Sequence, residues 1–249
     1  MTVREKLLVA WSGGKDSALA LYKILKIPHY EIVAILSTVT EEYDRISMHG
    51  VRTALLEQQA DSLGYPLERI YISKNPSNGE YESAMRGVLE RYQAEGVSSV
   101  VFGDIFLEEV RKYREEQLAI LGMRGVFPLW GRNTSGLART FIALGFKAVT
   151  TCVDSTMVSK DFVGKAFDRQ FLSELPSTVD PCGENGEFHS FVYDGPIFRK
   201  RILYAEGNVV LRENRFYYCD LIPLAPAHDA PSSDRGVTAR FDRPSSPRD

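Results

Sequence analysis

The sequence predicts an α/β protein with a doubly wound, mostly parallel sheet and a smaller α+β C-terminal domain. Apolar, β-branched segments alternate with segments of helical periodicity through the first half of the chain. After Gly122 this alternation gives way to shorter strands and turns. The composition is that of an ordinary globular protein, with 44% hydrophobic and 25% charged residues. At about 150 residues per domain, the length of 249 fits one large or two small domains.

The first half shows a clear pattern for each expected element. Residues 15–25 place Ala18, Leu21 and Leu25 at helical spacing, whereas residues 32–39 are almost continuously apolar, as in a strand covered on both faces. Strands are expected at 6–11, 32–39, 70–73 and 98–105, and helices at 15–25, 51–63, 81–95 and 108–121. This order predicts a mostly parallel sheet with right-handed crossovers.

The second half is expected to be smaller and mixed. Gly207-Asn208 separates two short β-rich segments, which is a hairpin signal, and Pro176 ends a helical stretch. Strands are expected at 126–130, 147–153, 188–193, 202–206, 209–212 and 216–224, helices at 135–144 and 162–175, and a glycine-rich loop at 181–187. Residues 225–249 hold four of the twelve prolines and only one aromatic residue, so they are expected to form a disordered tail. The predicted divisions are therefore 1–125, 126–224 and 225–249.

Composition excludes several classes of protein. A net charge of −3 gives no overall positive field for nucleic acid or for anionic lipid. Three widely spaced cysteines form neither a disulfide framework nor a CxxC metal site. No apolar run reaches the ~18 residues of a membrane span, and the N-terminus has no signal-peptide pattern. We therefore expect a cytoplasmic protein that binds no nucleic acid and no membrane.

The most informative segment lies between the first strand and the first helix. It reads Ser12, Gly13, Gly14, Lys15, Asp16 and Ser17. Adjacent glycines allow a ligand to approach the backbone, and the helix start directs N–H donors and a positive dipole at that ligand. A lysine and two hydroxyls suit phosphate. The spacing matches neither GxxxxGK[ST] nor GxGxxG. The alternative is a turn that only caps the helix.

Further candidates follow the other strands, whose carboxyl ends meet at one edge of such a sheet. Thr38 ends the second strand, where its backbone would contact adenine. Gly103 and Asp104 end the fourth strand, where the carboxylate would bind Mg²⁺ or a substrate group, or else serve as a helix cap. His49 lies in a polar loop, and is either a phosphate ligand or a structural histidine. Residues 111–114 form a basic cluster that is either a solvated face or a means of steering an acidic substrate.

A second polar constellation occupies residues 182–191. Glycines flank Glu184-Asn185, and Glu187 and His189 are expected on one face of the strand that follows. These side chains would orient an amine or act as general base toward ammonia. The alternative is a solvent-exposed turn.

Two motifs resemble known families. Residues 12–17 resemble the SGGKDS pyrophosphate loop of the N-type ATP pyrophosphatases, and residues 183–190 match the GExGE[FY]H[ST] signature of the diphthine–ammonia ligase family. Residues 101–105 and 111–114 also resemble that family. The resemblance covers roughly residues 6–224. It implies a HUP-like, adenine nucleotide alpha hydrolase-like fold, with an ATP pyrophosphatase domain at 1–125 and a substrate-binding domain at 126–224.

The resemblance also implies an activity. The carboxylate of diphthine, a modified histidine on elongation factor 2, would be adenylated by ATP and then attacked by ammonium. Ser12, Gly13, Gly14, Lys15, Asp16 and Ser17 would hold the phosphates, with Thr38, His49 and Gly103 completing the nucleotide site. Lys15, Asp104, Glu184, Glu187 and His189 would carry the chemistry, and Asp104 would bind Mg²⁺. A homodimer is a further expectation.

Two alternative functions use the same loop. A tRNA-modifying adenylation enzyme is disfavoured by the net negative charge and by the missing CxxC. A non-enzymatic adenine-nucleotide-binding module is disfavoured by the second polar constellation, because a sensor does not need it.

Overall fold

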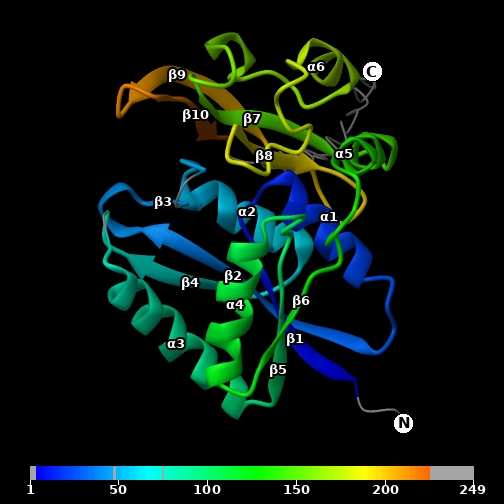
Figure 1. Cartoon of the computed structure of the whole chain (residues 1–249), viewed down its shortest axis with the longest axis vertical. Helices are drawn as coiled ribbons and strands as arrows, with labels where there is room; N and C mark the ends of the chain where they lie inside the picture. The colour runs from blue at the N-terminus through cyan, green and yellow to red at the C-terminus, as the bar shows by residue number, and fades with distance from the viewer. Residues whose placement is uncertain (1–3, 47–48, 75, 225–249) are drawn as a thin grey trace, which may run out of the picture.

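The computed structural model describes residues 4–46, 49–74 and 76–224. Its N-terminal half is built on a six-stranded sheet whose main strands are parallel (Figure 1). These are β1 (Glu5–Ala10), β2 (Tyr30–Thr40), β4 (Leu67–Ile72), β5 (Val97–Val101) and β6 (Arg124–Val126). Going across the sheet they run β4-β2-β1-β5-β6, and the two-residue β3 (Arg45–Ile46) pairs antiparallel with β2. The direction of winding therefore reverses beside β1.

Helices cover both faces of this sheet. Side chains of successive β1 residues point to opposite faces, so Leu7 packs in one buried cluster and Leu8 in another. The cluster of Leu7 contains residues of α1 (Lys15–Ile24) and α2 (Thr53–Leu63). The cluster of Leu8 contains residues of α3 (Asn78–Ala94) and α4 (Glu108–Ile120). The predicted doubly wound α/β fold is confirmed.

The C-terminal half forms a second, antiparallel sheet in the order β8-β7-β10-β9. Its elements are α5 (Thr134–Ala143), β7 (Lys147–Asp154), α6 (Arg169–Glu174), β8 (Phe188–Asp194), β9 (Tyr204–Arg212) and β10 (Phe216–Pro223). Short 3-10 turns lie at Glu41–Tyr43 and Lys160–Phe162. Figure 1 shows this sheet above α1 and α2. Phe188 and Phe191 of β8 belong to the same buried cluster as Leu7, so one core runs through both halves.

The predicted hairpin at Gly207-Asn208 is wrong. β9 runs unbroken through these residues, and the turn comes later, where Glu213 and Asn214 adopt left-handed φ angles of 53° and 48°. Gly207 instead lies opposite an irregularity in β10, and a Cβ there would be 3.1 Å from the carbonyl oxygen of Asp220. The glycine therefore marks a close approach of two backbones.

Three other predicted elements are shorter than expected. The strand predicted at 98–105 ends at Val101. The helix predicted at 162–175 begins only at Arg169, because Gly164 has a φ of 81°, Ala166 forms a bridge to Val149, and Asp168 caps the helix start. The strand predicted at 126–130 ends at Val126, where a turn begins.

No helix within the described residues is both long and apolar enough to cross a membrane. The boundary between 125 and 126 stays a prediction, and the tail predicted at 225–249 lies outside the described residues, as do positions 47 and 48 of the loop that contains His49.

Candidate active site

A pocket of about 400 Å³ lies at the carboxyl ends of β1, β2 and β5. In open α/β sheets, ligands bind at such a point, where the strand order reverses. Side chains of α3 and α4 form one wall, and residues 183–190 of the C-terminal half form another. Of the predicted site residues, all except Gly13 and Glu187 line this pocket. The structure thus brings the two polar motifs of the sequence together.

Residues 12–17, the predicted phosphate-binding loop and called the phosphate loop below, are held by their own hydroxyls and by β8. Ser12 Oγ accepts a hydrogen bond from the amide of Gly14 at 3.3 Å and lies 3.3 Å from Ser17 Oγ, which donates to the carbonyl of Gly14 at 2.9 Å. The amide of Lys15 donates to Ser190 Oγ at 3.2 Å. Since Gly14 occupies the N-cap position and has no side chain, the helix start is not closed in the usual way. This arrangement favours an anion site over a simple capping turn.

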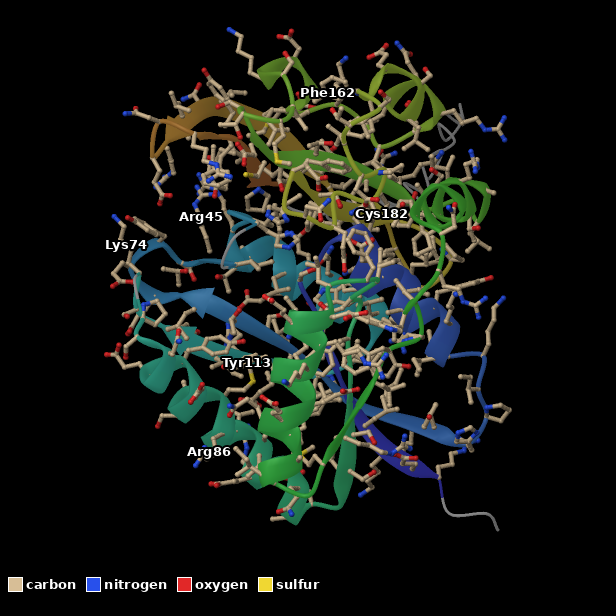
Figure 2. All side chains as sticks on the ribbon, in the orientation of Figure 1. Arg45, Lys74, Arg86, Tyr113, Phe162 and Cys182 are labelled. Atoms are coloured by element: carbon tan, nitrogen blue, oxygen red, sulfur yellow. The ribbon has the colours of Figure 1, made fainter. Side chains whose placement is uncertain are left out.

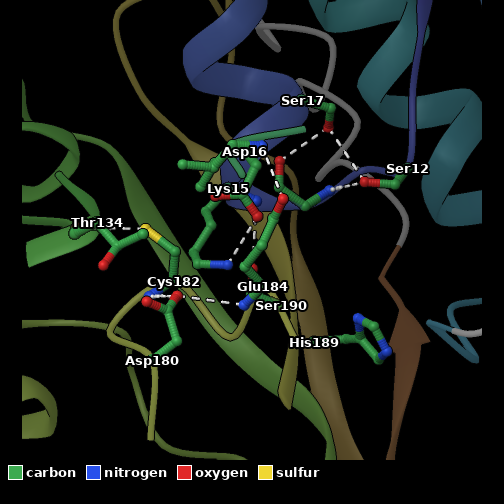
Figure 3. A network of polar contacts seen from close by, with 12 residues as sticks. Ser12, Lys15, Asp16, Ser17, Thr134, Asp180, Cys182, Glu184, His189 and Ser190 are labelled. Atoms are coloured by element: carbon green, nitrogen blue, oxygen red, sulfur yellow. Dashed lines mark hydrogen bonds and ion pairs between the residues drawn. The ribbon is translucent and has the colours of Figure 1, made fainter. Parts of the chain in front are cut away.

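The ammonium group of Lys15 lies against an apolar wall of the pocket. Its side chain is only 5% exposed, and Nζ lies 2.8 Å from Asp16 Oδ2 (Figure 3). The same ammonium faces the rings of Phe188 and Phe167, at 5.1 and 5.9 Å from their centroids. Burial is the largest influence and acts to lower the pKa of Lys15, but the charge and hydrogen bond of Asp16, together with the other negative groups nearby, outweigh it, so the pKa is raised. Lys15 is therefore a fixed positive charge.

Three carboxylates meet in the pocket: Asp16, Asp104 and Glu184. Glu184 reaches across from the C-terminal half, and its Oε1 accepts from the amides of Ile105 at 2.7 Å and Phe106 at 3.3 Å. Burial, and then the charges of Asp16 and Asp104, raise the pKa of Glu184 to about 7. Crowded carboxylates of this kind suit a cation or a proton-transfer role.

Asp104 is engaged by a cation of the protein itself. Arg114 Nε lies 2.8 Å from Asp104 Oδ2, and the guanidinium stacks on the ring of Phe102 at 4.4 Å from its centroid. Of the basic cluster at 111–114, Arg114 therefore faces the pocket. Arg111 does not line it, because Arg111 pairs with Glu115 and stacks on Trp130.

Two histidines face the loop as neutral bases. The rings of His49 and His189 lie 4.6 Å apart, and His49 Nδ1 is 3.3 Å from the carbonyl oxygen of Ser190, to which it donates. Burial lowers the pKa of His49 to about 4. Burial, together with His49 and Lys15, lowers the pKa of His189 far below its ordinary value. Both imidazoles are therefore uncharged at neutral pH and are weak bases.

Glu187 does not share a face with His189, contrary to the alternation expected from the sequence. It precedes β8, is fully buried, and does not line the pocket. Its carboxylate accepts hydrogen bonds from the amide of Asp180 at 3.0 Å and from the amide and side chain of Asn185, both at 2.9 Å. These contacts hold the 180–187 loop in shape.

Gly103 is required by packing. A Cβ at this position would lie 2.9 Å from the carbonyl carbon of Asp16 and 3.0 Å from the amide nitrogen of Ser17. Because both are backbone atoms at the start of α1, neither can move aside. Gly103 thus lets β5 approach the phosphate loop, while Thr38 lines the opposite side at the end of β2.

Sequence reasoning missed several pocket residues. Ser190 lies inside the 183–190 motif, and its hydroxyl position in that motif was an available signal. Tyr81 of α3 and Tyr113 of α4 also line the pocket. They look like ordinary positions on amphipathic helices, so no local pattern marks them.

The donor set fits Mg²⁺ only together with a nucleotide. Within the described ranges no group of three or more His, Cys, Asp or Glu side chains is arranged to hold an ion unaided. Asp16, Asp104 and Glu184 nevertheless interact with one another at the pocket. Mg²⁺ commonly takes one or two carboxylates and completes its octahedron with substrate phosphates and water. These carboxylates would hold it, and the ion would neutralise phosphate charge.

Comparisons with known proteins show the family of this chain. The diphthamide synthase N-terminal domain matches residues 5–125, and the diphthamide synthase C-terminal domain matches residues 133–220. Similar proteins, each named diphthine–ammonia ligase, come from Danio rerio (26% identity, 82% of this chain and 88% of the relative) and Homo sapiens (27%, 80% and 83%). A third, from Schizosaccharomyces pombe, is 26% identical over 82% of this chain, which spans only 37% of that longer protein. The chain belongs to the diphthamide synthase family, whose named members are ligases that form a C–N bond.

Proposed function

We propose that this protein is an ATP-dependent ligase that adenylates the carboxylate of diphthine, releases pyrophosphate and amidates the product with ammonium. One observation carries the proposal: the phosphate loop and the 183–190 segment come from opposite halves of the chain and line the same pocket. The names of the relatives support diphthine as the acid, and the proposal takes elongation factor 2 as the protein that carries it.

In the first step the loop holds the β- and γ-phosphates of ATP. The α1 dipole, the hydroxyls of Ser12 and Ser17 and the ammonium of Lys15 bind this group. A carboxylate oxygen of the substrate attacks the α-phosphorus, the bond to the bridging oxygen breaks, and pyrophosphate leaves with the electron pair. Lys15 stabilises the charge that develops on the leaving group. Arg114 of α4, held in place by Asp104 beyond the end of β5, orients the incoming carboxylate.

In the second step ammonia attacks the acyl carbon of the adenylate. Ammonium first loses one proton, and the nitrogen loses a second as the C–O bond to AMP breaks and AMP departs. His189 faces the pocket, and because its pKa is lowered it stays neutral and accepts a hydrogen bond that orients the ammonia. Glu184, with a pKa of about 7, accepts the first proton and passes it to solvent, and then accepts the second. Glu187 acts indirectly by shaping the loop that carries Glu184.

Other expectations from the sequence belong to this proposal. They are the use of Mg²⁺, the cytoplasmic location, a homodimer and the division of the chain at 125/126. Family membership favours amidation over the alternatives of a tRNA-modifying adenylation enzyme and a non-enzymatic nucleotide-binding module.

The products of ATP test the proposal. Purified protein is incubated with ATP, Mg²⁺, ammonium chloride and elongation factor 2 that carries diphthine, and the nucleotides and amide are quantified. We expect AMP, pyrophosphate and amide in equal amounts, and none of these products with elongation factor 2 whose histidine is unmodified. Formation of ADP and phosphate would contradict adenylation, and a failure to bind ATP would remove the whole proposal.

A further inference from the structure

Gln59 of α2 lies behind the phosphate loop, outside the pocket, and connects three parts of the molecule. Its side chain is fully buried. Oε1 accepts from Trp11 Nε1 at 2.9 Å, and Nε2 donates to the carbonyl oxygens of Gly13 at 3.0 Å and Val192 at 2.6 Å. The carboxamide therefore has its acceptor and both its donors engaged. A carboxylate offers no donor, and an aliphatic side chain offers neither donor nor acceptor.

The contact with Gly13 bears on the phosphate site through the geometry of the peptide bond. In a trans peptide the carbonyl of Gly13 and the N–H of Gly14 point in opposite directions. Gln59 Nε2 and the amide of Val192, at 2.9 Å, both hold the Gly13 carbonyl on the side away from the pocket. The N–H of Gly14 is thereby fixed on the pocket side, where Gly14 and Ser12 are lining residues.

Without such an anchor this peptide has other orientations. Gly13 has a φ of 74°, and glycine pairs populate both signs of φ with little cost. If the peptide flips, it replaces an N–H donor with a carbonyl oxygen facing the phosphates. The flip removes one favourable contact and adds one repulsive contact, both to the same anion.

We infer that Gln59 is a positioning residue for the pyrophosphate end of the nucleotide, and that it couples the C-terminal sheet to this site. The coupling runs from β8, through Val192 and the carboxamide, to Gly13. The inference rests on the proposed function, because it takes the loop as the site of the β- and γ-phosphates. Under this inference, binding of the pyrophosphate end also requires one buried side chain, that of Gln59, which does not contact the ligand.

Two substitutions separate positioning from general stability. Gln59→Met keeps the length of the side chain and removes all three hydrogen bonds, whereas Gln59→Glu keeps the shape and the acceptor for Trp11 but loses both donors. Gln58→Met is the matched control, since Gln58 is the preceding residue on α2 and does not line the pocket. ATP, inorganic pyrophosphate and AMP are titrated into each full-length protein by calorimetry, and folding is checked by circular dichroism.

Both Gln59 variants are expected to bind ATP and pyrophosphate about tenfold more weakly, the scale of one lost hydrogen bond to an anion, with AMP affinity changed less than about twofold. Gln58→Met should match the wild type for all three ligands. Three outcomes would overturn the inference and leave the proposed function standing: equally weakened binding of all three ligands, wild-type affinity of the Gln59 variants for pyrophosphate, or failure of both Gln59 variants to fold. A wild-type protein that binds no ATP would instead overturn the proposed function.

Discussion

Replacing Lys15 by methionine removes one charge from the pocket and little else. The lysine side chain is 5% exposed and packs against the rings of Phe167 and Phe188. Methionine has a similar length and keeps these apolar contacts, so the fold should be retained. The substitution also leaves the carboxylate of Asp16 without the ammonium that lies 2.8 Å away. The pocket therefore becomes more negative at the place where pyrophosphate would depart.

The expected magnitude follows from Coulomb's law. A unit charge about 4–6 Å from a phosphate oxygen, at an effective dielectric constant of about 20, contributes roughly 3–4 kcal/mol. If this interaction is made mainly with the departing pyrophosphate, its loss slows turnover by about 10²–10³-fold. Asp16, now unpaired, acts in the same direction. Turnover should fall more than ATP affinity does, because the charge on the leaving group grows in the transition state.

The measurement is the rate of pyrophosphate release with saturating ATP, acid substrate and ammonium. Lys23→Met provides the control, since Lys23 lies on the same helix, interacts with the carbonyl of Pro128 and does not line the pocket. This control should keep wild-type turnover. A loss below about threefold for Lys15→Met, with circular dichroism unchanged, would show that the loop is not at the reaction centre.

Three further predictions concern pH and packing. Glu184 is protonated below its pKa of about 7 and is a base above it, so the wild-type rate should rise between about pH 6 and 8. This rise should be lost in Glu184→Gln. A rise that persists in the variant would exclude Glu184 as the titrating group. The hydrogen bond from Arg52 lowers the pKa of Asp220 to about 2. Asp220→Asn should therefore lower Tm by about 2–4 °C at pH 7, and by progressively less as the pH falls from about 4 towards 2. An unchanged Tm at pH 7 would contradict a stabilising ion pair. Gly103→Ala should weaken ATP binding at least tenfold, since its Cβ would collide with the backbone of Asp16 and Ser17. Gly87→Ala is the control and should not weaken it, because nothing lies within 4 Å of a Cβ at Gly87. Equal ATP affinities of the two variants would refute the packing argument.

The N-terminal half was readable from sequence because its pattern and its packing agree. Strands such as β2 are covered on both faces and are therefore continuously apolar, and the helices between them keep their spacing. The antiparallel β3 was missed because two residues carry no periodicity. The misplaced hairpin has a different cause. Gly207 looks like a turn residue locally, but a close approach of β10 requires it, and that contact is not visible in the local sequence.

The parts of the site were visible in the sequence, but their arrangement was not. Spacing cannot separate Glu184, which faces the pocket, from Glu187, which is buried in the loop behind it. The difference depends on how the 180–187 loop folds back on itself. Gln59 gives no local signal at all, because its partners, two backbone carbonyls and the indole of Trp11, lie far away in the chain. Hydrogen bonds of this kind become apparent only when β8 is placed beside α1 and α2.

The seam between the two halves explains why neither half completes the site. From the C-terminal side, Ser190 accepts from the amide of Lys15, and Glu184 spans to the amides that follow β5. Elsewhere along the seam Arg45 pairs with Asp220 at 2.9 Å. Figure 2 labels Arg45 on the left and Cys182 on the right of the molecule. The same strand β8 thus shapes the phosphate loop and carries His189. If the proposed function holds, a ligase that shields an acyl-adenylate from water would gain from this arrangement, because β8 joins the surface proposed to bind ATP to the surface proposed to handle ammonia.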